Sequence, residues 1–294
     1  MTAETRPDSP KGFGAEVAAA AQAFSRVGAF NAVTPRDPAK RVVHGEAYGP
    51  DRMQAVDVFA PVAAAEPAPV AVFFHGGGWQ TGRRQEYGFV GRALASRGFL
   101  TVVAGYRLVP QIRYPAFLED AAGAARWAVD HAAALGGDPA RLAFIGHSAG
   151  GYIAVQLGYD TRYLHGAGVE PAHVRAVVGL SGPYSFLPLR TPATLATFSA
   201  AEDLDGTQPV NHARADGPAA LLVHGGRDTA VTAGQSVRMG RAIEAAGGHA
   251  EVRIHQTLTH TDTILAFSRP FRRKAPILDE VAGFLDTHLS RGAR

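Results

Sequence analysis

The fold of this chain is decided by one stretch of sequence, Phe144-Ile145-Gly146-His147-Ser148-Ala149-Gly150-Gly151-Tyr152. An apolar strand is predicted to run into the pattern Gly-x-Ser-x-Gly and then into a helix, which is the pattern of a nucleophile elbow. In such a sharp turn, side chains two residues before and after the serine would collide, and Gly146 and Gly150 remove them. The turn also places Ser148 at a helix N-terminus, where the dipole favours developing negative charge. We therefore predict that Ser148 is a nucleophile; from this stretch alone, the alternative is a glycine-rich turn with an incidental serine.

Outward from this stretch, short apolar runs alternate with longer helical segments. Strands are expected near 41–46 and 53–59 and then at the apolar runs 70–74, 100–104, 142–145, 176–180, 220–223 and 252–255. The intervening helices are expected at about 85–97, 116–135, 149–158, 233–246 and 275–289. Near-continuous apolar runs suit strands that are buried on both faces, as in a parallel sheet. The alternation therefore predicts a doubly wound α/β fold with right-handed crossovers.

Two segments fall outside this alternation. Residues 181–218 contain five prolines and several apolar residues, and a structureless loop of that length is uncommon inside a compact domain. We expect a small cap or lid insertion there, helical in part, that covers a pocket. Helical spacing of apolar residues over 15–30 predicts a short amphipathic helix, and the N-terminal region 15–35 is a candidate part of the same cap. Because no linker divides the chain, one domain is expected over residues 1–294.

A glycine-rich loop follows the expected strand 70–74 and reads His75-Gly76-Gly77-Gly78-Trp79. Consecutive glycines let the backbone turn so that its N–H groups point into a cleft, where they stabilise the oxyanion of an acyl-transfer intermediate. A His-Gly-Gly-Gly loop has this role in lipases and esterases. We assign the oxyanion hole to Gly77, Gly78 and the N–H of Ala149, with Gly76 as the alternative if the assignment slips by one residue. The competing interpretation is a phosphate-binding turn, but the P-loop Lys-Ser/Thr pair and a G-x-G-x-x-G fingerprint are absent.

A nucleophilic serine needs a base and an orienting acid, and in this type of fold the acid follows the serine and the histidine comes last. Asp228 lies just after the expected strand 220–223, at the strand end where sites in open α/β sheets gather. His260 lies in the loop after the expected strand 252–255, far enough beyond Asp228 for one helix and one strand. We predict Asp228 as the acid and His260 as the base. The alternatives are a turn-forming aspartate and a surface-loop histidine.

The other titratable residues fit these roles less well. Asp262 follows His260 too closely, and the competing acids Asp203, Asp205 and Asp216 fall in the expected cap. His75 is expected to orient its loop by hydrogen bonds. The remaining histidines either flank the serine (His147), belong to the sheet core or its edge (His224 and His255), or lie away from the predicted strand ends (among them His249 and His288). With no His-Glu-x-x-His motif and no tight cluster of histidines and carboxylates along the sequence, no metal is predicted.

Composition narrows the class of protein. Of the 294 residues, 46% are hydrophobic and 19% are charged, which is a globular, core-forming balance. The absence of cysteine excludes a disulfide framework, a Cys-ligated zinc and a cysteine nucleophile. The net charge of +3 is diffuse and its only tight basic run is Arg272-Arg273-Lys274, so no nucleic-acid partner is expected. Neither a signal peptide nor a stretch of membrane-spanning length is visible, so we expect a cytoplasmic protein unless a leader has been removed.

Together these residues resemble the α/β-hydrolase superfamily, in its hormone-sensitive-lipase-like and bacterial carboxylesterase branches. The resemblance runs from about 69 to 265 and is also carried by Tyr106-Arg107-Leu108-Val109-Pro110, Tyr114-Pro115, Glu119-Asp120, Arg126-Trp127 and Gly136-Gly137-Asp138-Pro139. It implies an α/β-hydrolase fold, with a mostly parallel central sheet flanked by helices and a small cap. Gly105 and Gln111 depart from the hormone-sensitive-lipase pattern, which has acidic residues at both positions. The His-Gly-Gly-Gly-Trp loop and modest cap are also similar to kynurenine formamidase-like and polysaccharide-acyl esterases.

The resemblance implies a serine carboxylesterase that hydrolyses small to medium esters through an acyl-enzyme on Ser148, without a cofactor. The expected partner is a small-molecule ester, and the sequence is compatible with a homodimer. Five residues are expected to shape the substrate pocket: Trp79, Tyr152, Phe186, Leu187 and Phe198. Two alternatives stay open: an arylformamidase or amidase of the same fold, and a non-catalytic hydrolase-like binding protein, against which the filled triad positions argue.

Overall fold

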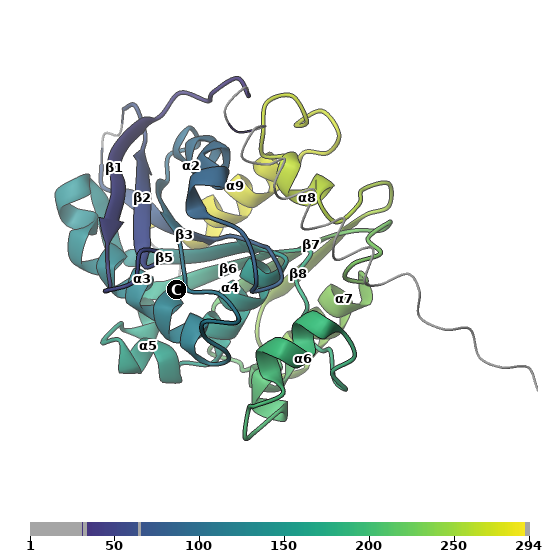
Figure 1. Cartoon of the computed structure of the whole chain (residues 1–294). Coiled ribbons are helices and arrows are strands. Elements are labelled where there is room, and N and C mark those ends of the chain that lie inside the picture. The colour runs from purple at the N-terminus through teal and green to yellow at the C-terminus, as the bar shows by residue number, and fades with distance from the viewer. Residues whose placement is uncertain (1–30, 32–33, 64–65, 292–294) are drawn as a thin grey trace, which may run out of the picture.

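The computed structural model describes residues 31, 34–63 and 66–291, in which a central β-sheet lies between two layers of helices (Figure 1). In this part of the chain the sheet has eight strands: β1 (Lys40–Ala47), β2 (Ala55–Ala60), β3 (Ala68–Phe74), β4 (Leu100–Ala104), β5 (Gly137–His147), β6 (Val174–Leu180), β7 (Ala219–Gly225) and β8 (Ala250–His255). Their order in the sheet is β1-β2-β4-β3-β5-β6-β7-β8. β2 pairs antiparallel with β1 and with β4, and the other neighbours are parallel. The predicted, mostly parallel sheet is therefore confirmed.

Helices cover both faces of this sheet. They are α2 (Gly88–Ala95), α3 (Ala116–Ala132), α4 (Ala149–Tyr159), α5 (Arg162–Gly166), α6 (Pro192–Phe198), α7 (Gly234–Ala245), α8 (Asp262–Leu265) and α9 (Ile277–His288). Short 3-10 helices are η1 (Arg84–Tyr87), η2 (Ala133–Leu135), η3 (Pro171–His173), η4 (Asp205–Thr207) and η5 (Pro209–His212). Successive residues of β3 face opposite sides: Val70 and Val72 belong to the hydrophobic cluster that includes residues of α3, α4 and α7, whereas Ala71 and Phe73 belong to the cluster that includes residues of α2 and α9. The apolar runs of β3 to β7 are thus buried on both faces, as a parallel sheet requires, whereas the run in the edge strand β8 is only half-buried.

The parallel strands bring the four predicted functional segments to one edge of the sheet. In the register of β3 and β5, Phe74 lies beside Gly146, so the glycine-rich loop and the elbow leave the sheet at the same level. β7 and β8 end side by side, with Gly225 next to His255. The segments that carry the predicted oxyanion hole, nucleophile, acid and base therefore all emerge at the carboxyl edge, where sites of open α/β sheets form.

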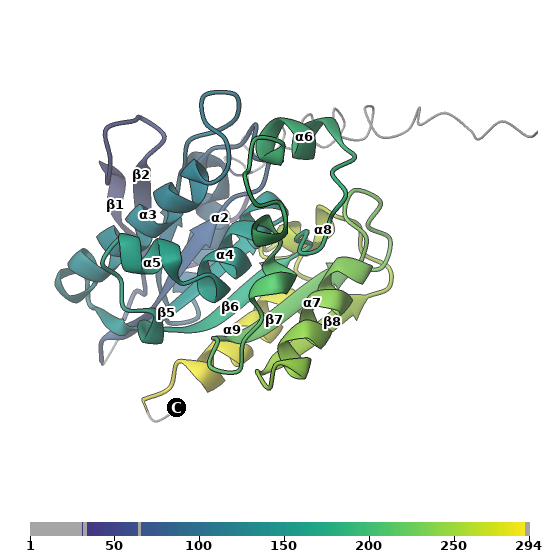
Figure 2. The ribbon, with the colours of Figure 1, turned by 90° about the horizontal axis from the view of Figure 1, so that it is seen from below.

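The segment expected as a cap, 181–218, contains α6, η4 and η5. Thr191 begins α6, because its hydroxyl accepts a hydrogen bond from the N–H of Thr194 at 3.0 Å and Pro192 occupies the first helical position. In both views α6 lies at the periphery of the molecule (Figures 1 and 2). The N-terminal helix expected over 15–30, and with it most of 15–35, lies outside the described residues. Within the described ranges, no helix combines the length and the apolar character needed to cross a membrane.

Candidate active site

Ser148 occupies a strained turn between β5 and α4. Its backbone angles are φ 56° and ψ −120°, a combination that residues with side chains rarely adopt. A Cβ atom on Gly146 would lie 2.0 Å from the carbonyl oxygen of Gly150, and a Cβ atom on Gly150 would lie 2.1 Å from that of Phe74. The N–H of Ser148 donates to the carbonyl of Leu180 at 2.8 Å and holds the turn against β6. Glycine at both flanking positions therefore permits this turn, as predicted from the sequence.

Ser148, His260 and Asp228 are joined by hydrogen bonds. The Ser148 hydroxyl donates to Nε2 of His260 at 2.9 Å, and Nδ1–H of His260 donates to Oδ2 of Asp228 at 2.8 Å. All three are buried, with 7–9% of their surface exposed. Both distances lie within the range that a nucleophile, its base and an orienting acid require. The structure thus brings together three residues that are separated by 112 and 32 positions in the sequence.

Asp228 is held in its ionised form by its surroundings. Burial alone would raise the pKa of this carboxyl, but hydrogen bonds from His224 and His260 lower the pKa well below its usual range. Its second oxygen, Oδ1, accepts from the N–H groups of Ala230 and Val231 at 3.0 and 2.8 Å. Because both oxygens are engaged, the carboxylate is fixed in orientation and can stabilise a positive charge on His260.

Two histidines for which the sequence predicted other roles support this arrangement. His224 was expected only as a core or edge residue of the sheet; it is fully buried, and its Nε2 lies 3.2 Å from Oδ2 of Asp228. His147 was noted only as a neighbour of the serine, yet its Nε2–H donates to the backbone carbonyl of His260 at 2.9 Å. Burial lowers the pKa of His147 to about 3, so its ring stays neutral. The available signal for His224 was its position four residues before Asp228, on the strand that delivers the acid.

The glycine-rich loop makes a tight turn beside Ser148. Gly77 has φ 125°, and a Cβ atom there would lie 2.1 Å from the carbonyl oxygen of Thr81, so only glycine fits. As expected, His75 hydrogen-bonds within its loop, through Nδ1–H to the carbonyl of Gly76 at 2.8 Å. In the described part of the chain, the N–H groups of Gly78 and Ala149 donate no hydrogen bond to the protein. They are therefore free to bind an anion in the pocket that both residues line.

Ser148 and His260 open into a pocket of about 770 Å³. Three of the five predicted substrate residues line it: Trp79, Phe186 and Leu187. Tyr152 and Phe198 do not, because both are fully buried behind Trp79, with ring centroids 5.4 and 5.0 Å from its own. In this structure Tyr152 and Phe198 support the pocket wall through Trp79, and their contact with substrate stays a prediction. A sequence pattern of aromatic residues does not distinguish these two layers.

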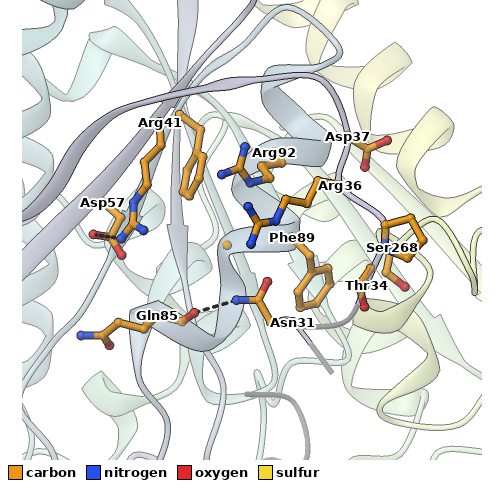
Figure 3. A pocket seen from close by; sticks show the side chains of 13 residues that line it. Asn31, Thr34, Arg36, Asp37, Arg41, Asp57, Gln85, Phe89, Arg92 and Ser268 are labelled. Atoms are coloured by element: carbon orange, nitrogen blue, oxygen red, sulfur yellow. Dashed lines mark hydrogen bonds and ion pairs between the residues drawn. The ribbon is translucent and has the colours of Figure 1, made fainter. Parts of the chain in front are cut away.

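A second pocket, of about 140 Å³, is built by residues near β1, β2 and α2 (Figure 3). Arg36, Arg41 and Arg92 line it, and Arg41 forms an ion pair with Asp57 at 3.0 Å. Its described lining includes one serine, Ser268, and no histidine that could act as a base. This pocket therefore lacks a nucleophile–base pair, and the larger pocket is the candidate active site.

A family model described as BD-FAE matches residues 56–243, from β2 into α7. The chain belongs to the BD-FAE family. The match includes Ser148 and Asp228 and ends before His260, so the link to His260 comes from the hydrogen bonds described above. Membership also confirms the resemblance to the hormone-sensitive-lipase-like branch of the α/β-hydrolase superfamily.

Relatives of this BD-FAE protein carry esterase names. Carboxylesterase NlhH of Mycobacterium tuberculosis is 41% identical over 112 residues, which make up 38% of this chain and 35% of that protein. Isoprenylcysteine alpha-carbonyl methylesterase ICME of Arabidopsis thaliana is 28% identical over 247 residues, with 77% of this chain and 58% of that protein covered. Among solved structures, a truncated carbohydrate esterase from gut microbiota has a TM-score of 0.72 at 18% identity, covering 86% of this chain and 96% of that one. The chain thus spans less than two thirds of the two curated relatives, and the structural likeness confirms the α/β-hydrolase fold.

Proposed function

We propose that this BD-FAE family member is a serine carboxylesterase that hydrolyses small to medium carboxylic esters through an acyl-enzyme on Ser148. The observation that carries the proposal is the unbroken hydrogen-bond path from Ser148 through His260 to Asp228, at 2.9 and 2.8 Å, beside a pocket of about 770 Å³. The names of NlhH and ICME support the same class of reaction.

Acylation begins when Nε2 of His260 takes the hydroxyl proton of Ser148 as Oγ attacks the ester carbonyl. Negative charge then develops on the carbonyl oxygen, where the N–H groups of Gly78 and Ala149, with Gly77 as a further donor, are positioned to receive it. Each such donor contributes about 3 kcal/mol to stabilising the transition state. The ionised Asp228 keeps His260 in the tautomer that accepts the serine proton and stabilises the imidazolium that forms.

The tetrahedral intermediate collapses when His260 donates the proton from Nε2 to the departing alkoxide, which leaves as the alcohol. A water molecule then takes the place of the alcohol. His260 removes a proton from this water as its oxygen attacks the acyl carbon, and the carboxylic acid leaves as Ser148 recovers its proton. No cofactor is needed for any of these steps, because the charges that develop are met by the described residues.

Residues 181–218 are proposed to act as the cap over this site. Phe186, Leu187 and Ala193 of this segment line the same pocket as Ser148 and Trp79, which gives the acyl or alcohol group an apolar surface. The pocket volume of about 770 Å³ lies inside the range of about 300–1,000 Å³ that small-molecule sites occupy. This size supports small or medium esters as substrates.

The test compares Ser148→Ala with Ser185→Ala, because Ser185 is a second serine that lines the same pocket. Ser148→Ala is expected to abolish turnover of p-nitrophenyl butyrate and labelling by a fluorophosphonate, while Ser185→Ala retains both. Thermal unfolding checks that both variants fold. Turnover retained in folded Ser148→Ala would refute the mechanism, and a wild-type protein that neither labels nor turns over esters would indicate a binding protein. Initial rates on N-formylkynurenine, measured beside the ester, separate an arylformamidase from a carboxylesterase.

A further inference from the structure

Three side chains meet at the edge of the sheet opposite the candidate active site. His249 immediately precedes β8, and Glu251 is the second residue of that strand. The carbonyl of His249 accepts a hydrogen bond from the N–H of Ala220, so the backbone is already paired with β7 at this point. Residues two apart in extended backbone project to the same side. His288, the last residue of α9, lies against this pair.

The distances place all three groups within reach of one ion. One ligand atom from each residue lies within 4.8 Å of the other two. Nε2 of His249 is 3.9 Å from Oε1 of Glu251, and the rings of His249 and His288 are 5.1 Å apart between centroids. The 3.9 Å contact is an ion pair when His249 is protonated, and it is longer than a hydrogen bond. One potential ligand atom from each of the three side chains therefore points into the same small region.

We propose that His249, Glu251 and His288 form a site for a zinc ion or a similar transition-metal ion. Two imidazole nitrogens and one carboxylate oxygen are a ligand set that Zn²⁺ binds, with water in the fourth position. Nitrogen ligands also discriminate against Ca²⁺ and Mg²⁺, which prefer oxygen.

Small movements complete the coordination. Tetrahedral ligands about 2.0–2.1 Å from zinc lie about 3.3 Å from one another, so the three side chains must approach by roughly 1 Å. The side chain of His249 is 57% exposed, which leaves it room to rotate that far.

Arg253 limits the affinity of this site. Its guanidinium donates to Oε2 of Glu251 at 2.7 Å, which orients the carboxylate and leaves Oε1 facing His249. Its positive charge also opposes a cation, so the site is expected to bind more weakly than a closed, four-ligand structural zinc site.

The proposed ion would connect β8 with α9. β8 is the edge strand of the sheet, and α9 is the last helix of the described chain. The three ligands are close together only in the folded chain. An ion that binds them therefore stabilises the folded state by mass action. This role is independent of the proposed esterase reaction, which takes place at the carboxyl ends of the strands.

The experiment titrates zinc chloride into untagged protein that has been stripped with EDTA, using calorimetry and thermal unfolding. The variants are His249→Gln, His288→Gln and Glu251→Gln. His165→Gln is the matched control, because His165 is an exposed histidine on α5 outside the cluster.

Wild type and His165→Gln are expected to bind one equivalent of zinc with the same affinity. At a zinc concentration about 100 times Kd, their unfolding midpoint should rise by about 5 °C. Each cluster variant should lose more than about tenfold in affinity and most of the midpoint shift. Equal midpoints of all five proteins in EDTA show that the variants fold. Zinc binding of wild-type strength in His249→Gln and His288→Gln, or no binding by wild type, would overturn the proposal, whereas p-nitrophenyl butyrate turnover is expected to be the same in all of them.

Discussion

Replacing Asp228 by asparagine tests the proposed mechanism most directly, because the structure determines how the new amide must orient. Oδ1 of Asp228 accepts from two backbone N–H groups, those of Ala230 and Val231. If the amide nitrogen took this position, two buried N–H groups would face a donor, at about 1–3 kcal/mol each. The amide oxygen therefore stays there, and the amide nitrogen faces His260 and His224. His260 can move its proton to the other ring nitrogen, and Nε2 of His224 keeps its hydrogen bond to the carbonyl of Val231 at 2.8 Å.

An amide nitrogen donates, so it stabilises the His260 tautomer that has its proton on Nε2. That proton then points at Ser148, and Nε2 is no longer able to accept the serine proton. The expected loss in kcat is about 10⁴-fold, which corresponds to about 5 kcal/mol in activation free energy. The volume of the side chain is unchanged, so the folded structure is expected to persist.

The assay is kcat for p-nitrophenyl butyrate, with thermal unfolding as the check on folding. Asp262→Asn is the matched control: Asp262 begins α8 two residues after His260, but its carboxylate binds Lys274 and Thr259 instead of the triad. The control should stay within about tenfold of wild type. A kcat of Asp228→Asn within tenfold of wild type, in a folded protein, would refute the assignment of Asp228 as the orienting acid.

Three further predictions concern stability, pocket shape and charge. Burial lowers the pKa of His147 to about 3 and of His75 to about 4, from an ordinary value of 6.5. Both rings are neutral in the folded state and take up protons on unfolding, so their contribution is present above pH 6.5 and is lost as pH falls. Urea titrations should give about 4 kcal/mol less unfolding free energy at pH 5 than at pH 7. About half of that difference should remain in His147→Gln, and an unchanged difference would contradict the reasoning. Phe198→Ala should lower the unfolding free energy by about 3–5 kcal/mol and keep the preference for acyl-chain length. Phe186→Ala should change that preference, because Phe186 lines the pocket. The opposite result in p-nitrophenyl ester assays would show that Phe198 and not Phe186 contacts the substrate. Arg190 lines the active-site pocket, whose described residues include no carboxylate. Arg190→Gln should therefore lower kcat/KM for a carboxylate-bearing ester roughly two- to fivefold relative to kcat/KM for p-nitrophenyl butyrate. An unchanged ratio would exclude a role of Arg190 in charge selection.

The features predicted correctly from the sequence are those that depend on short-range sterics or on strand order. Gly146 and Gly150 were predictable because the collisions of a Cβ atom involve backbone within a few residues or on the neighbouring strand. Asp228 and His260 were predictable as partners because each follows a parallel strand, and parallel strands end at one edge.

The contacts that could not be predicted from the sequence depend on how segments far apart in the chain pack against one another. His147 and His260 meet across 113 positions, and nothing in the composition of either segment indicates that a ring nitrogen reaches a carbonyl. Tyr152 and Phe198 have the same character as Trp79, but only packing shows that they stand one layer behind it. The cluster of His249, Glu251 and His288 escaped a search for ligands close together in the sequence, because its third member lies on another element.

The strained turn at Ser148 and the proposed metal site lie at opposite ends of the strands. Ser148 holds backbone angles that cost about 1–3 kcal/mol, and this cost is tied to the reaction because the turn exposes the nucleophile. Contacts that offset it are least disruptive when they do not restrict the pocket. An ion at His249, Glu251 and His288 meets this condition, since it joins β8 and α9 at the edge away from Ser148. If both proposals are correct, removing His288 lowers the unfolding midpoint in zinc and leaves kcat unchanged, whereas removing Ser148 abolishes kcat and leaves the zinc-dependent shift in place.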